Sequence, residues 1–138
     1  MTVHLTAGDG DSALDERLSN ELDTFNFAAV GRDDLREFTV KAEDDGELVA
    51  GLSGWTWGTC AGIGMVWVRE DVRRDGWGGR LLAAAEDVAR ERGCRQVLVS
   101  SFTFQAPDFY RRHGYVEFAR SPDLPVEGEA DVHFLKIL

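Results

Sequence analysis

Apolar residues recur with two distinct periods along this chain, and the first period is helical. Between residues 12 and 30 they return at three- and four-residue intervals: Leu14, Leu18, Leu22 and Phe25. This spacing predicts an amphipathic helix over residues 12–30. Ser12 and Asp15 stand in capping-box order, and we therefore expect Ser12 to be the N-cap of the helix.

From Phe38 the apolar period changes to two, which is typical of a half-buried strand. The turn residues Asp44-Asp45-Gly46 follow, and residues 48–57 then predict a returning strand, so the pair forms a hairpin. A second turn is expected at residues 60–62, before a third strand over 63–68. Three successive antiparallel strands are the simplest arrangement of these segments.

The second half of the chain alternates strands and helices. A helix of about 16 residues, ended by Gly93, lies between the strand 63–68 and an apolar run over 96–104. Such a strand–helix–strand unit places its two strands parallel, so we expect a mixed sheet in an α+β fold. A short helix from Pro107 and two strands, over 115–120 and 132–137, complete a single predicted domain, 1–138.

Charge is distributed unevenly along a chain whose net charge is −10. Residues 69–112 carry nine Lys and Arg against seven Asp and Glu, whereas residues 1–68 carry four against thirteen. Positive potential attracts anions, so an anionic cofactor would favour the middle segment, and the acidic remainder would repel nucleic acid. Without a membrane-length apolar run or a signal-peptide pattern, we expect a soluble, cytoplasmic protein with neither nucleic acid nor membrane as partner.

A glycine- and arginine-rich stretch, residues 72–82, opens the helix in that middle segment. The first turn of a helix has amide hydrogens without internal partners and attracts phosphate. Gly76, Gly78 and Gly79 leave those amides open, and three arginines add positive charge: Arg73, Arg74 and Arg80. A diphosphate suits this site; the alternative is a turn whose glycines only let the helix pack tightly.

Two better-known phosphate loops do not match this stretch. A P-loop requires a lysine after its second glycine, and no lysine occurs between Lys41 and Lys136. The Rossmann fingerprint directly follows a first strand, whereas here several antiparallel strands come first.

Two motifs in the correct order resemble the GNAT superfamily of acetyltransferases. Arg73-x-x-Gly76-x-Gly78 resembles the family's first motif, and Ala106-Pro-Asp-Phe-Tyr110-Arg-Arg-His-Gly114-Tyr115 resembles the second. The order of strands and helices also agrees over about residues 37–118. The resemblance implies a twisted sheet of about six to seven strands, whose parallel central pair splays apart around coenzyme A.

The resemblance also implies roles for individual residues. Backbone groups of Val66, Trp67 and Val68 would pair with the pantetheine arm, and the diphosphate would lie on the amides of one segment: Arg74, Asp75, Gly76, Trp77, Gly78 and Gly79. An amine would attack the acetyl group of acetyl-CoA directly in a ternary complex, with no metal. Tyr110 matches the family's general acid, which protonates the departing thiolate; the alternative is a tyrosine that only packs and hydrogen-bonds.

The chain departs from the family pattern at two positions. Where many members carry a pantetheine-binding asparagine this chain has Thr103, whose hydroxyl would replace part of the amide. Where some carry a glutamate base it has Leu98, so we expect deprotonation through water, and the base is not identified. Candidate relays are Ser100, Ser101, Glu70 and His113.

The acceptor is expected to be a cationic amine, because the segments that vary in such folds are acidic here. They are the N-terminal helix and the loop that follows it, the tip near residues 57–61, and the loop 121–130. Together they carry Glu21, Asp23, Asp33, Asp34, Asp123, Glu127 and Glu129. We therefore expect an acetyl-CoA-dependent N-acetyltransferase acting on a small molecule or a protein amine. A noncatalytic coenzyme A-binding module is the alternative, and the strand 132–137, if exposed, would offer an edge for a homodimer.

Overall fold

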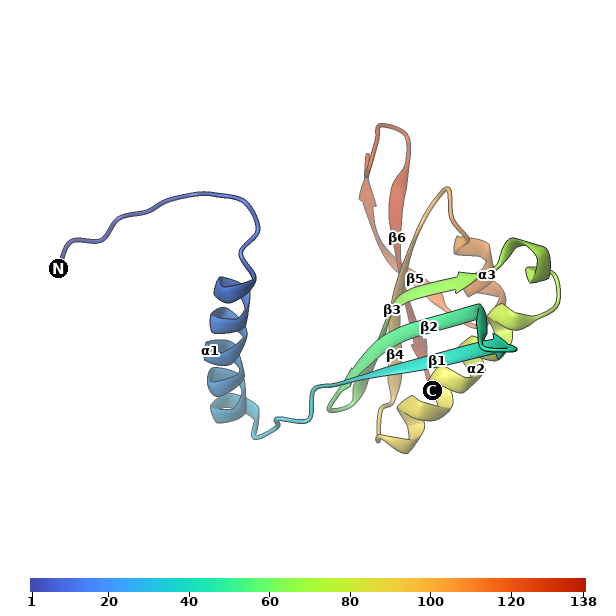
Figure 1. Cartoon of the computed structure of the whole chain (residues 1–138), viewed down its shortest axis with the longest axis horizontal. Coiled ribbons are helices and arrows are strands. Elements are labelled where there is room, and N and C mark those ends of the chain that lie inside the picture. The colour runs from blue at the N-terminus through green and yellow to red at the C-terminus, as the bar shows by residue number, and fades with distance from the viewer. The chain divides into compact units, whose positions relative to one another are not determined.

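The computed structural model describes all residues of the chain, 1–138, and divides them into two compact units, residues 1–33 and 34–138 (Figure 1). The first unit holds one helix, and the second holds the whole sheet with its remaining helices. None of the helices is both long enough and apolar enough to cross a bilayer.

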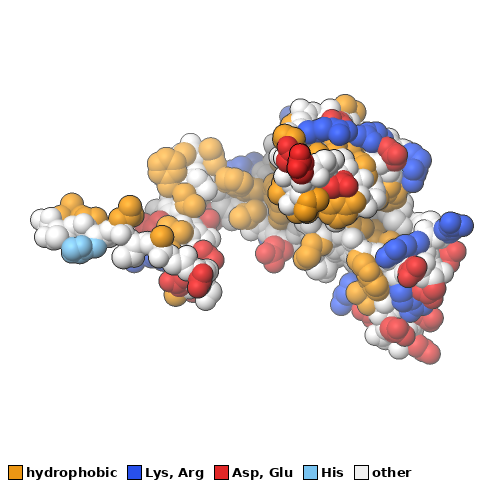
Figure 2. Space-filling model, turned by 90° about the horizontal axis from the view of Figure 1, so that it is seen from above, with side chains coloured by type: hydrophobic (Ala, Val, Ile, Leu, Met, Phe, Trp, Pro, Cys, Tyr) orange, Lys and Arg blue, Asp and Glu red, His pale blue; other side chains and the backbone are white.

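The helix of the first unit, α1, runs over Ser12–Val30 as the apolar spacing predicts. Its cap is Asp11, whose carboxylate accepts a hydrogen bond from the backbone N–H of Leu14 at 3.1 Å. The prediction that Ser12 caps the helix is therefore wrong by one residue, because the carboxylate one position earlier takes that role. Gly31, in the left-handed conformation, ends the helix. No residue of the first unit covers its apolar stripe, and hydrophobic side chains are visible on this unit in Figure 2.

The second unit is built on a six-stranded sheet with the order β1-β2-β3-β4-β6-β5. Its strands are β1 (Arg36–Asp44), β2 (Glu47–Trp57), β3 (Cys60–Val68), β4 (Gln96–Phe102), β5 (Val116–Pro122) and β6 (Ala130–Ile137). Only β3 and β4 pair in parallel; the other neighbours are antiparallel. The predicted hairpin and the mixed α+β sheet are confirmed, and Asp45 and Gly46 both take the positive φ of its two-residue turn.

Two expectations about this sheet are wrong. The turn expected at residues 60–62 lies earlier, because Gly58 takes a positive φ and Cys60, Ala61 and Gly62 already pair with β4. The last strand is not an edge, since β6 lies between β4 and β5 and pairs with both. The predicted homodimer edge at 132–137 is therefore occupied within the chain.

Helix α2 (Trp77–Glu91) contacts strands β1 to β4, and the shorter α3 (Pro107–Arg112) contacts β4 and β5 (Figure 1). The core forms under these helices, where Leu82, Val97 and Phe134 are nearly or fully shielded from solvent. Glu86 on α2 accepts a hydrogen bond from the Tyr115 hydroxyl. It also forms an ion pair with Lys136, whose Nζ lies 2.7 Å from Glu86 Oε1, and this pair joins the helix to β6. Burial and the neighbouring Glu86 carboxylate raise the pKa of Tyr115 far above its ordinary range.

Candidate active site

A cleft opens where the two parallel strands separate. β3 and β4 pair only from Cys60–Gly62 against Gln96–Leu98, and beyond Gly62 the two strands diverge. The diverging ends border a cleft of about 960 Å³, which also reaches the first turn of α2 and the inner side of α3. From Ile63 onward, β3 therefore has one edge that no strand of this chain covers.

A β-bulge shapes β3 at the start of this free edge. In the pairing with β2, Ile63 faces Gly54 and Met65 faces Ser53, so Gly64 is the extra residue. Gly64 lines the cleft. A bulge redirects the backbone away from the regular ladder, which is a way to aim an amide into a site.

The glycines at the start of α2 serve two different purposes. Gly76 has a φ of +83°, and no atom lies within 4 Å of where its Cβ would be, so its role is conformational. A Cβ on Gly78 would lie 2.9 Å from the Phe109 ring, and one on Gly79 would lie 2.9 Å from His113 Nε2. Both positions therefore allow α3 to approach α2 closely, which supports the packing alternative for these two glycines. All three glycines nevertheless line the cleft.

The cleft is electropositive although the chain as a whole is acidic. Arg73, Arg74 and Arg112 line it together with His113, and no Asp or Glu does. The Arg73 Nε donates to the carbonyl of Val68 at 2.9 Å, which fixes this side chain at the end of β3. Arg74 and Arg112 form no ion pair, so their charge is available to an anion.

Tyr110 projects from α3 into the same cleft. Its ring is 7% exposed and packs edge-on against Phe109 and Tyr115, with centroids 5.1 and 5.8 Å away. The hydroxyl makes no hydrogen bond within the protein, unlike that of Tyr115, which is bound to Glu86. Burial raises the pKa of Tyr110, so the phenol stays protonated at neutral pH.

The structure brings most of the predicted cofactor residues to this cleft. Those that line it are Val66, Trp67, Val68, Arg73, Arg74, Gly76, Gly78 and Gly79, together with Tyr110. Asp75, Trp77 and Arg80 do not line it, and the Arg80 guanidinium lies 4.1 Å above the Trp77 ring.

Thr103 is placed elsewhere than the sequence suggested. Its hydroxyl donates to the Glu129 carboxylate and accepts from the backbone N–H of Ala130 at 3.0 Å, and the residue does not line the cleft. Its hydroxyl joins the end of β4 to the loop before β6.

Sequence reasoning missed several residues that line the cleft. They are Ile63, Gly64, Met65, Val99, Phe104, Gln105, Ala106, Phe109 and Arg112. The loop between β4 and α3 had a signal that could have been used, because ligands of open α/β sheets bind beyond the carboxyl ends of parallel strands. For Arg112 the sequence carried no signal that separated it from its neighbour Arg111. Arg111 forms ion pairs with Asp108 and Glu117 and does not line the cleft.

Comparison with known proteins places the chain among acetyltransferases. The model described as "Acetyltransferase (GNAT) family" matches residues 7–115. A blasticidin-S acetyltransferase of Streptomyces morookaense is 42% identical over 91 residues, which cover 63% of this chain and 65% of that protein.

Solved structures agree with this match. A crystal structure of an acetyltransferase from Bacillus cereus has a TM-score of 0.84 and 32% identity, and the match covers 97% of this chain and 98% of that one. A streptothricin acetyltransferase from Bacillus anthracis, solved with acetyl coenzyme A, shares the fold with a TM-score of 0.65 at 19% identity, over 74% of this chain and 62% of that one.

Proposed function

Because this chain belongs to the acetyltransferase (GNAT) family, we propose that it transfers an acetyl group from acetyl-CoA to a primary amine of a small cationic molecule. The observation that carries the proposal is the cleft between β3 and β4, which has three arginines and no carboxylate in its lining. In a chain of net charge −10, such a cleft is suited to an anionic co-substrate.

The residues present fit coenzyme A along the length of the cleft. The backbone amides from Arg74 to Gly79 and the positive end of α2 would hold the diphosphate, with Arg74 and Arg112 adding charge. The uncovered edge of β3, over Ile63–Val68, offers backbone groups to an extended arm as a neighbouring strand would. Acetyl-CoA supplies an acetyl group activated as a thioester.

Backbone and side chain then have separate tasks at the acetyl end. An amide at the Gly64 bulge would polarise the carbonyl as negative charge develops on its oxygen. Tyr110, whose hydroxyl has no partner in the protein, would give its proton to the departing thiolate sulfur. An amine bound beside these groups would be held together with the thioester before the direct attack.

A cationic acceptor is supported by charge and by a relative. The loop 121–130 and the residues around it carry Asp123, Glu127 and Glu129, which attract cations. The Streptomyces relative is named for an antibiotic, blasticidin S, and we extend that acceptor class to this chain as part of the proposal.

An amine screen tests this function. The protein is mixed with acetyl-CoA and a panel of blasticidin S, streptothricin, an aminoglycoside, spermidine and a neutral arylamine, and released thiol is measured. We expect turnover with at least one cation and a rate that falls with added salt. Equal rates with the neutral arylamine would contradict a cationic acceptor, and tight acetyl-CoA binding without turnover would indicate a coenzyme A-binding module instead.

Tyr110→Phe tests the assigned acid. We expect turnover to fall by about 10²-fold or more, as for loss of a positioned general acid, while the Kd for acetyl-CoA stays unchanged. Unchanged turnover would remove Tyr110 from the reaction. Tyr115→Phe is the matched control, because that hydroxyl is bound to Glu86 outside the cleft.

A further inference from the structure

The proposed reaction needs a group that removes a proton from the acceptor. A primary amine is protonated at neutral pH, with an ordinary pKa of about 10, and only the neutral form attacks a carbonyl. No carboxylate lines the cleft. The cleft histidine, His113, is directed elsewhere: its Nδ1 bonds the Phe109 carbonyl at 2.8 Å and its Nε2 lies against Gly79, at the diphosphate end.

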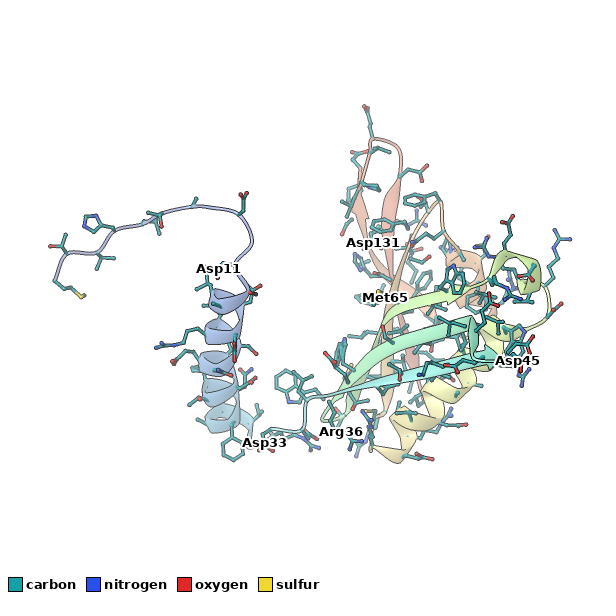
Figure 3. All side chains as sticks on the ribbon, in the orientation of Figure 1. Asp11, Asp33, Arg36, Asp45, Met65 and Asp131 are labelled. Carbon is teal, nitrogen blue, oxygen red and sulfur yellow. The ribbon has the colours of Figure 1, made fainter.

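Two polar residues, Asp131 and His133, lie instead on the face of the sheet opposite α2 and α3. Val132 and Phe134 of β6 are fully buried toward the helices, so the alternating residues Asp131 and His133 project from the other face. Figure 3 labels Asp131 on this strand and Met65, 73% exposed, on β3. Since Tyr110 would reach the acetyl group from the helix side, an amine approaching from the opposite face would come from the side of the sheet that carries Asp131 and His133.

Ser100 lies between His133 and the cleft. It lines the cleft, and it lies two residues beyond Leu98, the last residue of β4 that pairs with β3. It also lies directly opposite His133 in the antiparallel pairing of β4 with β6. Directly opposed residues share a face with Cβ atoms about 4.5–5.5 Å apart, close enough for a hydroxyl or one water to join them.

His133 is held in place by its other neighbours. Its Nε2 lies 3.0 Å from the Ser121 hydroxyl, and its Nδ1 has no partner in the protein. Asp131, two residues away on the same face, has a buried Oδ1 without any hydrogen bond.

We propose that His133 accepts the acceptor's proton through Ser100, a role that rests on the proposed acetyl transfer. Nε2–H donates to Ser121, which leaves the Nδ1 lone pair free to accept. The ammonium gives one proton to the Ser100 hydroxyl, that hydroxyl gives its own to an intervening water, and the water gives one to Nδ1, so that the neutral amine is left.

The rest of the reaction then balances. The amine nitrogen bonds the carbonyl carbon, the carbon–sulfur bond breaks, and the thiolate takes the Tyr110 proton. The second proton lost by the nitrogen is returned to Tyr110 through water, and His133 releases its own proton to solvent.

The charged surroundings of His133 are simple. On its face of the sheet, Asp131 is the one charged neighbour on β6, while β4 contributes Ser100 and Phe102. β5 contributes Ser121, together with Phe118, whose ring centroid is 6.3 Å from that of His133. A single carboxylate and no cation therefore face the imidazole on this side of the sheet.

A first test reads the imidazole directly and needs no turnover. The chain has three histidines, His4, His113 and His133, so ¹⁵N spectra of their rings are resolved, and the His133→Gln variant assigns the signals. At pH 8 we expect His133 to carry its proton on Nε2, with Nδ1 bare. A proton on Nδ1 would overturn the proposal, because that nitrogen could then accept nothing.

A second test measures kcat/KM from pH 6 to 10 with blasticidin S, or with the fastest acceptor in the amine panel. His133→Gln should lose about 10²-fold at pH 7, the lower range for general base catalysis. It should recover most of that loss at pH 10, where about half of an amine with a pKa of about 10 is already neutral. Ser100→Ala should be slower than wild type but add no further loss in the His133→Gln background. His4→Gln, the same substitution in the first unit, is the control and should match wild type.

The outcomes separate the two proposals. A loss in His133→Gln that is equal at pH 7 and pH 10, or no loss, overturns the relay and leaves acetyl transfer intact. Absence of turnover by the wild-type protein with every amine overturns both.

Discussion

Gly78 offers a direct test of why the start of α2 is rich in glycine. A Cβ at this position would lie 2.9 Å from Cζ and 3.0 Å from Cε2 of the Phe109 ring, closer than side chains normally pack. Gly78→Ala therefore forces α3 away from α2 or rotates the ring. Overpacking of this kind costs about 1–3 kcal/mol of unfolding free energy.

A double-mutant cycle measured by urea unfolding isolates this contact. Phe109→Ala removes the ring, and in that background Gly78→Ala should cost less than about 0.5 kcal/mol, within the additivity error for independent sites. Gly76→Ala is the matched control: its φ of +83° strains alanine by about 1–3 kcal/mol with no atom near, so its cost should be equal in both backgrounds. A Gly78→Ala cost that survives removal of Phe109 would refute the packing explanation.

Three further changes have expected outcomes. Arg112→Ala should weaken acetyl-CoA binding by about tenfold in calorimetry and reduce its salt dependence, while Arg111→Ala, whose guanidinium is ion-paired outside the cleft, should leave the Kd unchanged. Glu117 has its pKa lowered to about 2 by hydrogen bonds from Arg120 and Arg111, so its stabilisation is complete above about pH 4.5 and is lost as the pH falls toward 2. When Tm is measured against pH, Glu117→Gln should lose less stability than wild type between about pH 4.5 and 2. Identical Tm profiles for the two proteins would contradict this role of Glu117. Lys136→Met should lower the unfolding free energy by about 1–3 kcal/mol in urea, because buried Glu86 loses its ion-pair partner, and no change would contradict a stabilising pair.

The elements of the fold were predictable because their signals are local. The period of apolar residues and the turn at Asp45-Gly46 locate β1 and β2, and Gly93 follows the end of α2 at a φ of +84°. The turn expected at residues 60–62 failed for a nonlocal reason: Gly62 is glycine because the Trp55 ring lies where its Cβ would be. A glycine required by a neighbour across the sheet looks like a turn glycine in the sequence.

The parts of the site whose backbone position follows from a sequence motif were predictable. The parts that depend on which partner a side chain finds were less so. Tyr110 and the start of α2 reach the cleft as the motifs imply, although whether they bind and react as proposed is for experiment. Thr103 turns to Glu129, because a hydroxyl at the end of β4 finds a carboxylate in the loop before β6. His133 has no signal in the sequence, since its proximity to Ser100 depends on the pairing of strands 33 residues apart.

The most direct measurement of the central claim is calorimetric titration of the wild-type protein with acetyl-CoA and, separately, with acetyl-pantetheine. The two share the thioester and the arm, but only the first carries the diphosphate that α2 and the cleft arginines are proposed to hold. The account predicts that acetyl-CoA binds and that acetyl-pantetheine binds at least about 100-fold more weakly, as expected for losing several charge-assisted hydrogen bonds. Equal affinities, or no binding of acetyl-CoA, would contradict it.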